Sequence, residues 1–408
     1  MFDFEEMGSH FLGTVTGGSW RDGISVKLTN AVSIEDVTVG KFVTVQGQRK
    51  RFFAVVTDLS LETSEARLRM NPPDSEFMAN VLEGASVFGQ LKLVPYLLMS
   101  GTEAAMLDGP QPAKTLPAHF SPVASASEGD IALVFGEEDE RHFYIGNPLD
   151  LEAKVCLDME KLVQRSNGVF GKSGTGKTFL TRLLLIGILQ KGVASNLIFD
   201  MHSEYGWGGR DSERARTVKG LKQLFPAQVG VFSLDEESSR RKGLSPDYIV
   251  QISYQEIEPE DIELLAGVLN LSPIQTQLIH PIAAALREDS GDDWINKFLE
   301  LHPSSAEFET LMDKIHSPVP GTILALRRKL QSLKRMSFLS EQPTARTGDV
   351  VNRIIEYLDR GLHVVLEFGR YGDDLSSYIL VANLLTRRIH EKYVRRTELA
   401  MGDESQRP

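Results

Sequence analysis

A glycine-rich segment, GKSGTGKT, runs from Gly171 to Thr178 and constrains the fold more than any other feature of the sequence. It fits the pattern G-x-x-x-x-G-K-[ST] at every fixed position. A short apolar run precedes it, and a strongly apolar helical pattern follows it. In that context the glycines let backbone N–H groups turn inward around phosphate oxygens, at the positive end of a helix. The segment predicts a phosphate-binding loop, the alternative being a glycine turn that binds no nucleotide.

The residues of this loop have different expected roles in nucleotide binding. Lys177 would reach the β- and γ-phosphates of ATP, and Thr178 would ligate Mg²⁺. ATP and Mg²⁺ are therefore the expected ligands. The other residues would enclose the phosphates through their backbone, namely Gly171, Lys172, Ser173, Gly174, Thr175 and Gly176.

The sequence pattern changes near residue 150, which predicts two domains. Within the first, residues 1–150, apolar and polar positions alternate from residue 9 to 62, as in a small N-terminal β-barrel. Residues 71–130 are rich in Pro, Ala, Ser and Gly and have weak periodicity, which indicates that part of this segment is a long irregular connection over the surface. Two further strand-like runs could complete the barrel, at residues 130–135 and 142–145.

The second domain, residues 151–408, has the rhythm of an α/β fold. Apolar runs alternate with helical patterns, which indicates βαβ units and the mainly parallel sheet of a RecA-like P-loop NTPase. An almost entirely helical stretch at about 255–345 indicates an inserted helical subdomain, and a capped helix is expected from Asp373 and Asp374 to about Arg395. The expected strands are residues 168–170, 196–200, 229–234, 248–254 and 363–368.

Polar residues follow the strand expected at 196–200, in the sequence FDMHSEY. Asp200, His202 and Glu204 would lie at a carboxyl edge, where ligands bind in open α/β sheets. Asp200 or Glu204 could contact the Mg²⁺ shell or position a water molecule. Alternatively, Asp200 caps a turn and His202 packs in the fold. A zinc site from all three would need a further well-placed ligand.

P-loop enzymes also need an acidic residue at the end of a second apolar strand. Asp235 and Glu367 are the candidates in this sequence. Glu367 follows the apolar residues Val364, Val365 and Leu366, but Phe368 and Gly369 come next, so a purely structural strand end is the alternative.

The charge of the sequence does not identify a partner. The net charge of −12 gives no overall attraction to nucleic acid, which usually requires a basic excess or a concentrated basic face. Local clusters remain candidates for DNA contact, although solvated helix faces explain such clusters more often. These clusters are residues 327–335, Arg387 with Arg388, and Arg395 with Arg396.

Neither the N-terminus nor the cysteine content indicates secretion. Acidic residues stand where a signal peptide would carry basic ones, and the longest apolar run is too short to cross a bilayer. The only cysteine, Cys156, cannot form an internal disulfide and is expected in the core. We therefore expect a cytoplasmic protein with no membrane partner.

The order of these parts resembles that of the HerA-type ATPases, hexameric DNA translocases related to the FtsK pumps. The resemblance extends over nearly the whole length. An N-terminal barrel of the HAS type comes first, then GKSGTGKT, then FDMHSEYGW, which is similar to the family's Asp-Pro-His-Gly-Glu-Tyr element. A helical insertion containing GTILALRRKL follows, and then HVVLEFG and the helix SSYILVANLLTRRI.

The resemblance implies roles for particular residues. Lys177 and Thr178 would act at the phosphates and Mg²⁺, and Asp200 and Glu204 would lie near the nucleotide, with Asp200 a candidate metal ligand and both candidate catalytic groups. Arg165, twelve residues before Lys177, falls where the family often places a nucleotide-facing arginine. The residue beside it is serine, where the family has histidine.

The end of the sequence departs from the family pattern. In the family, the helix that here ends near Arg396 leads to a Walker B strand ending in Glu-Glu-Ala-His or Asp-Glu-Ala-His, and an arginine finger follows. The sequence stops at Pro408 before any such strand. It is interpreted as a fragment, the alternative being a variant that binds ATP without efficient turnover.

The resemblance implies an ATP-hydrolysing homo-hexamer that moves double-stranded DNA through a central channel. Such motors work with a nuclease in DNA-end processing or with an effector enzyme in antiphage defence. One alternative is a nucleotide-gated ring scaffold that organises a partner enzyme without translocation. Another is a conjugation-type secretion ATPase. Hydrolysis stimulated by DNA distinguishes the motor from the scaffold.

Overall fold

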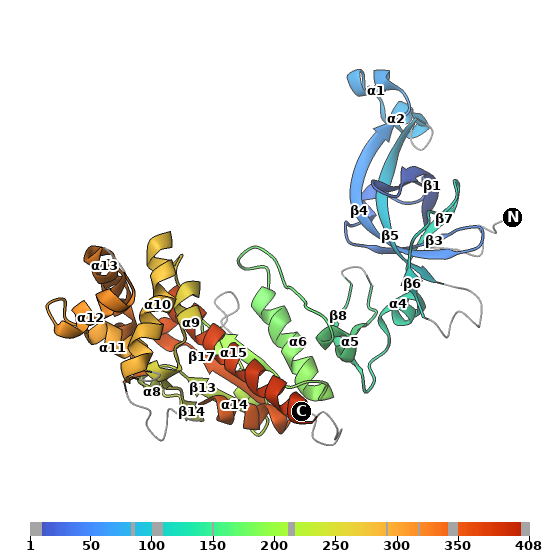
Figure 1. Ribbon diagram of the computed structural model, residues 1–408. Helices are drawn as coiled ribbons and strands as arrows, with labels where there is room; N and C mark the ends of the chain where they lie inside the picture. The colour runs from blue at the N-terminus through green and yellow to red at the C-terminus, as the bar shows by residue number, and fades with distance from the viewer. Residues whose placement is uncertain are drawn as a thin grey trace. The chain divides into compact units, whose positions relative to one another are not determined.

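The computed structural model describes residues 10–82, 86–99, 109–148, 151–210, 217–290, 293–316, 319–341 and 350–400. The polar end of the sequence, residues 401–408, lies outside the described residues. The chain divides into two compact units, Met1–Gly168 and Val169–Pro408 (Figure 1). Within the described residues, no helix is both long and apolar enough to cross a membrane.

The first unit contains an antiparallel sheet that closes on itself. β2 pairs with both β1 and β5, so the strand order β2-β1-β7-β3-β4-β5 returns to β2. Alternate side chains point inward and form an apolar interior, which confirms the expected β-barrel. The strands are β1 (Phe11–Ser19), β2 (Gly23–Leu28), β3 (Phe42–Gln46), β4 (Arg51–Thr63), β5 (Val87–Met99) and β7 (Pro122–Ser125), with β6 (Gln111–Pro112) added beside β5 and the 3-10 helix η2 (Ile34–Asp36) before β3.

The region expected to be an irregular connection contains the longest pairing of this sheet. β5 pairs with β4 from Arg51 opposite Met99 to Thr63 opposite Val87. Two register shifts interrupt this pairing, and β5 is only partly buried over its first four residues. These irregularities weaken the period-two pattern that identifies a strand, so the sequence pattern did not reveal β5. The helices α1 (Ala66–Met70) and α2 (Glu76–Leu82) follow β4.

The two runs expected to complete the barrel do not join it. Residues 130–135 belong to helix α4 (Glu128–Phe135), where Ser127 and Asp130 form a reciprocal capping box. Asp130 is buried and also pairs with Arg51 of β4 at 2.8 Å. The second run forms β8 (His142–Gly146), which pairs with β9 (Val155–Asp158) in a separate sheet, followed by α5 (Met159–Val163). Cys156 of β9 is buried, as expected.

The second unit contains a parallel sheet in the order β10-β17-β13-β14. Successive side chains of the central strand β17 pack into two different apolar cores. Val365 packs with residues of α6, whereas Val364 and Leu366 pack with residues of α14 and α15. Helices therefore cover both faces, as the sequence predicted. The elements are β10 (Leu197–Asp200), β13 (Val229–Ser233), β14 (Tyr248–Ile249), β17 (His363–Glu367), α6 (Lys177–Lys191), α14 (Val350–Asp359) and α15 (Leu375–Leu399).

The strand expected at residues 168–170 is not formed. These residues have no regular structure, and among the described residues β10 pairs only with β17. Val169 is half-buried and Phe170 is exposed, so this short run lacks the cross-strand partners that stabilise a strand. The prediction of a strand before the phosphate loop was therefore wrong for this structure.

The expected helical insertion follows β14. Its two ends are joined where β15 (Ile252–Ser253) pairs in parallel with β16 (Leu339–Ser340). Its helices bury a shared apolar core that includes Trp294 and Phe298. The insertion contains η3 (Tyr254–Glu256), α9 (Pro259–Leu264), α10 (Pro273–Ser290), α11 (Trp294–Glu300), α12 (Ala306–Lys314), α13 (Pro320–Leu330) and η4 (Gln331–Arg335). Shorter elements elsewhere in the unit are β11 (Gly209–Arg210), β12 (Thr217–Val218), α7 (Leu221–Leu224), α8 (Glu236–Arg241) and η5 (Gly369–Tyr371).

Candidate nucleotide site

The glycine-rich loop opens helix α6, which begins at Lys177. Gly174 and Gly176 have φ angles of 80° and 88°, a conformation that favours glycine. At Gly171 a Cβ atom would stand 2.5 Å from the Thr175 hydroxyl oxygen, so a side chain there would displace the loop. The backbone thus has the close turn that a phosphate-binding loop requires.

The charge of this loop suits an anion. Lys177 Nζ donates to the carbonyl oxygen of Lys172 at 2.7 Å, and the Thr175 hydroxyl donates to the same oxygen at 2.8 Å. Among the described residues, no carboxylate forms an ion pair with Lys177. The half-buried ammonium group at the positive end of the helix therefore lacks a compensating negative charge among these residues. A phosphate group would supply it, so the residues fit ATP.

Helix α6 holds Glu204 at two points. The hydroxyl of Thr178 donates to Glu204 Oε2 at 3.0 Å, and Arg182, one turn later, donates to the backbone carbonyl of Glu204. Glu204 follows β10 and is exposed. The expected Mg²⁺ ligand, Thr178, and an acidic side chain therefore meet beside the phosphate loop. This pair of oxygen groups suits the hard Mg²⁺ ion.

Asp200 is almost completely buried, with 1% of its surface exposed, and it organises the loop that carries Glu204. Its Oδ1 accepts the backbone N–H of Glu204 at 2.8 Å. Its Oδ2 accepts the N–H groups of Tyr205 and Gly206 at 2.8 and 3.2 Å. Both oxygens thus accept hydrogen bonds within the chain, and the carboxylate fixes the backbone position of Glu204.

The structure does not bring Asp200, His202 and Glu204 together as a metal centre. His202 Nδ1 instead lies 3.9 Å from Asp373 Oδ1. Within the part of the chain that the structure describes, no group of three or more His, Cys, Asp or Glu side chains could hold a metal ion. The zinc alternative therefore has no support among these residues.

Glu367 ends β17 directly beside Asp200 in the parallel register. It is 3% exposed, and its Oε1 atom has no hydrogen-bond partner. Burial, together with the nearby carboxylate of Asp200, raises the pKa of Glu367 to about 7, while Lys242 and Trp207 oppose the shift. A buried acid with an unpaired oxygen and a shifted pKa is typical of a functional site.

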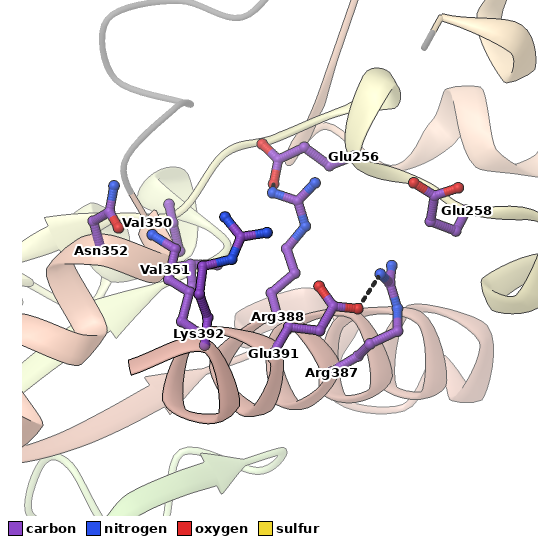
Figure 2. A pocket seen from close by; sticks show the side chains of 10 residues that line it. Glu256, Glu258, Val350, Val351, Asn352, Arg387, Arg388, Glu391 and Lys392 are labelled. Atoms are coloured by element: carbon purple, nitrogen blue, oxygen red, sulfur yellow. Dashed lines mark hydrogen bonds and ion pairs between the residues drawn. The ribbon is translucent and has the colours of Figure 1, made fainter. Parts of the chain in front are cut away.

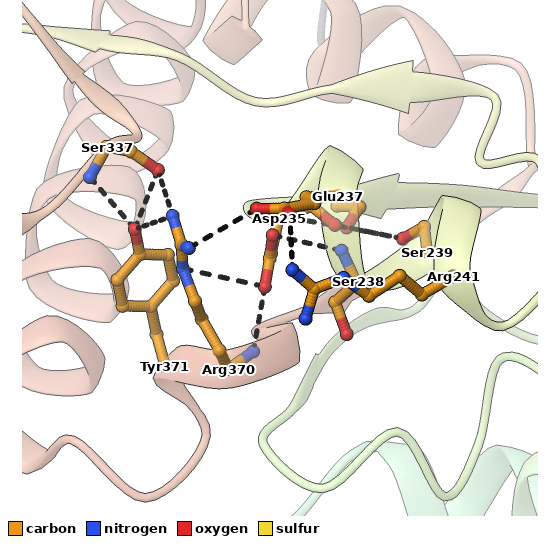
Figure 3. A network of polar contacts seen from close by, with 9 residues as sticks. Asp235, Glu237, Ser238, Ser239, Arg241, Ser337, Arg370 and Tyr371 are labelled. Atoms are coloured by element: carbon orange, nitrogen blue, oxygen red, sulfur yellow. Dashed lines mark hydrogen bonds and ion pairs between the residues drawn. The ribbon is translucent and has the colours of Figure 1, made fainter.

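Asp235 was the other candidate for the acidic residue at the end of a second strand. It takes part in a separate hydrogen-bond network (Figure 3). Its Oδ1 accepts the backbone N–H of Ser238 at the start of α8, and its Oδ2 accepts the backbone N–H of Arg370. The Arg370 guanidinium then donates to Ser337 and Tyr371 at 2.7 and 3.1 Å. The network joins the end of β17 to the helical insertion, and it occupies the Asp235 carboxylate.

Basic side chains of α15 are also engaged within the chain (Figure 2). Arg387 pairs with the buried Asp261 at 2.8 Å, and Arg388 pairs with Glu256 at 2.8 Å. Arg396 pairs with Asp359. These arginines are therefore paired with carboxylates of the same chain in this structure.

Arg165 lies just after α5, at the end of the first unit, and is exposed. Its backbone carbonyl accepts the side-chain amide of Asn167 at 2.7 Å. Arg182 and Trp207 were not identified from the sequence. The i, i+4 spacing of Thr178 and Arg182 on a helix could have indicated the first, because such residues share a face.

A phosphate loop that opens a helix, beside a parallel sheet whose neighbouring strand supplies an acidic residue, defines the class of P-loop NTPases. Residues 143–389 match the family model described as the central domain of the helicase HerA. Because the match covers more than half of the 408 residues, the chain belongs to this family and is a HerA-like ATPase. Among the curated proteins compared with it, none matches.

Proposed function

We propose that this chain binds ATP with Mg²⁺ at the loop from Gly171 to Thr178 and hydrolyses it. The observation that carries the proposal is the hydrogen bond between the Thr178 hydroxyl and the Glu204 carboxylate beside the phosphate loop. It joins an expected metal ligand to a side chain able to accept a proton. Magnesium, when bound, neutralises the charge of the β- and γ-phosphates.

Each residue contributes to the reaction in a definite way. Lys177 exchanges the carbonyl of Lys172 for phosphate oxygens. Thr178 would hold the metal in place of its present bond to Glu204, and the Glu204 carboxylate would then orient a water molecule and accept its proton. Asp200 would keep Glu204 in place through the loop amides that it accepts, and its role toward the metal would be indirect.

At the level of the assembly, we propose a homo-hexamer that moves double-stranded DNA, together with a nuclease or a defence effector. Membership of the HerA family supports this motor. Arg165 would face the nucleotide as the family resemblance implies. The protein would act in the cytoplasm.

Substitution of Glu204 by Gln tests the proposed chemistry. The amide keeps an oxygen that accepts from Thr178 but cannot take a proton at neutral pH. We expect ATP affinity to change by less than about threefold while turnover falls by roughly 100-fold or more. Binding is measured with a fluorescent ATP analogue, and turnover by phosphate release.

The exposed Glu288, which pairs with Lys314 on the helical insertion, provides a matched control. Glu288→Gln should leave both quantities unchanged. Normal turnover in Glu204→Gln would show that Glu204 is not the proton acceptor. Tight ATP binding with no turnover in the unaltered chain would favour the ring scaffold over the motor.

A further inference from the structure

Two of the buried polar atoms around the proposed site have no hydrogen-bond partner among the residues that the structure describes. One is the acceptor Glu367 Oε1, and the other is the indole donor Trp207 Nε1. Buried groups of this kind are rare, because they have lost water without gaining a partner. A donor and an acceptor in this state would both be satisfied by a single hydrogen bond between them.

The two groups occupy the same small region. A Cβ atom on Gly206 would stand only 2.9 Å from Glu367 Oε1, so the backbone next to Trp207 runs directly over the carboxyl group. The Trp207 indole lies near enough to act as a hydrogen-bond donor that lowers the pKa of that carboxyl group. In this structure the contact does not meet the distance and angle of a full hydrogen bond. A small displacement of the loop would close it.

The backbone before Trp207 is fixed by several other hydrogen bonds. Asp200 accepts the N–H groups of residues 204–206. From the opposite side, the N–H groups at the start of α7 donate to the carbonyls of Tyr205 and Gly206 at 2.9 and 3.1 Å. Because these hydrogen bonds hold residues 204–206 together, a movement of Glu204 would displace the whole segment. The next side chain along the chain that could gain a hydrogen-bond partner is Trp207.

We propose that Trp207 and Glu367 are positioning residues for ATP hydrolysis, and that their hydrogen bond closes when Glu204 leaves Thr178 for the nucleotide. The bond would hold the loop from Glu204 to Trp207 in the arrangement that serves the reaction. The inference rests on the proposed function, because it takes Glu204 as the group that moves.

The test compares three single variants and one double variant by turnover and by ATP affinity. Trp207→Phe keeps an aromatic ring and removes the donor. Glu367→Met removes the acceptor at similar volume, whereas Glu367→Gln retains an acceptor oxygen. We expect the first two to lower kcat by about tenfold with little change in ATP affinity. Glu367→Gln should keep near-normal kcat, and the Trp207→Phe/Glu367→Met double variant should be no slower than either single variant.

A second readout follows Trp207 itself, without turnover. Addition of Mg²⁺ and a non-hydrolysable ATP analogue should change the tryptophan fluorescence. The change should be absent in Trp207→Phe, reduced in Glu367→Met and retained in Glu367→Gln. Trp20→Phe, which removes an exposed tryptophan of the first unit, is the matched control and should retain it.

Three outcomes would overturn the inference. Normal kcat in Trp207→Phe would show that the indole N–H has no part in positioning. Loss of activity in Glu367→Gln equal to that in Glu367→Met would show that the ionised carboxylate, and not its acceptor oxygen, is needed. Failure of the unaltered chain to bind ATP would refute the proposed function and the inference with it, and this result differs from the other two.

Discussion

At the scale of single residues, two acidic side chains lie at the ends of neighbouring strands but in different environments. They are Asp200 and Glu367. Asp200 accepts three backbone N–H groups, whereas Glu367 retains an oxygen with no hydrogen-bond partner among the described residues. Burial without such hydrogen bonds stabilises the neutral form of an acid. The same edge of the sheet therefore holds one carboxyl group that is fully hydrogen-bonded and one whose pKa is raised to about 7.

The raised pKa of Glu367 predicts a dependence of stability on pH. The folded chain binds the proton up to about pH 7, whereas an unfolded glutamate loses it near pH 4.5. Below the pKa of Glu367 in the unfolded chain, the stabilisation from the neutral acid is fully present, and its raised folded pKa contributes no penalty to the free energy of unfolding. This contribution to stability is lost as pH rises through the pKa of Glu367 in the folded chain. Relative to Glu367→Gln, the unaltered chain should lose roughly 3 kcal/mol of unfolding free energy between pH 4.5 and pH 8.

Urea unfolding of both proteins, without Mg²⁺ or nucleotide, measures this difference. Groups common to both proteins cancel, although Asp200, Lys242 and Trp207 face the carboxyl group and set the size of the effect. A difference that does not change with pH would show that the pKa of Glu367 is the same in the folded chain as in the unfolded chain.

At the scale of elements, helix α4 depends on one residue with two partners. Asp130 accepts the backbone N–H of Ser127 in the capping box and pairs with Arg51 of β4. Asp130→Ala removes the cap and leaves a partly buried arginine without its charge partner, which should destabilise the segment by about 3 kcal/mol.

Hydrogen exchange of the α4 amides, followed by mass spectrometry in the full chain, reports this local change. Amide exchange there should accelerate by roughly 100-fold. Glu128→Ala, an exposed position in the first turn of the same helix, is the control and should have little effect. Equal protection in both variants would mean that packing, not Asp130, holds the helix.

The elements also show where sequence patterns suffice. β17 and α15 were predicted closely, because a buried apolar strand and the Asp374 cap are local signals. Helix α4 was mistaken for a strand, although Ser127 and Asp130 carried a capping signal. The strand expected at residues 168–170 failed for another reason. A strand needs partners, and partners are set by the tertiary fold.

At the scale of the whole molecule, most of the correct predictions came from the order of the motifs and domains along the sequence. The barrel, the phosphate loop, the acidic element after β10 and the helical insertion follow one another as expected, and the family match agrees. The sequence also pointed to Thr178 and Glu204. Their direct contact, the use of Asp200 by loop amides, and the Trp207 and Glu367 pair depend on packing between distant segments, which local patterns do not encode.

The most direct test of the account is ATP hydrolysis by this chain, with and without linear double-stranded DNA, beside Lys177→Ala and a direct nucleotide-binding assay. The account predicts turnover that DNA stimulates and that Lys177→Ala lowers by at least about 100-fold, because the substitution removes the ammonium group proposed to contact the phosphates. Turnover unaffected by Lys177→Ala, or ATP binding with no turnover in the presence of DNA, would contradict it.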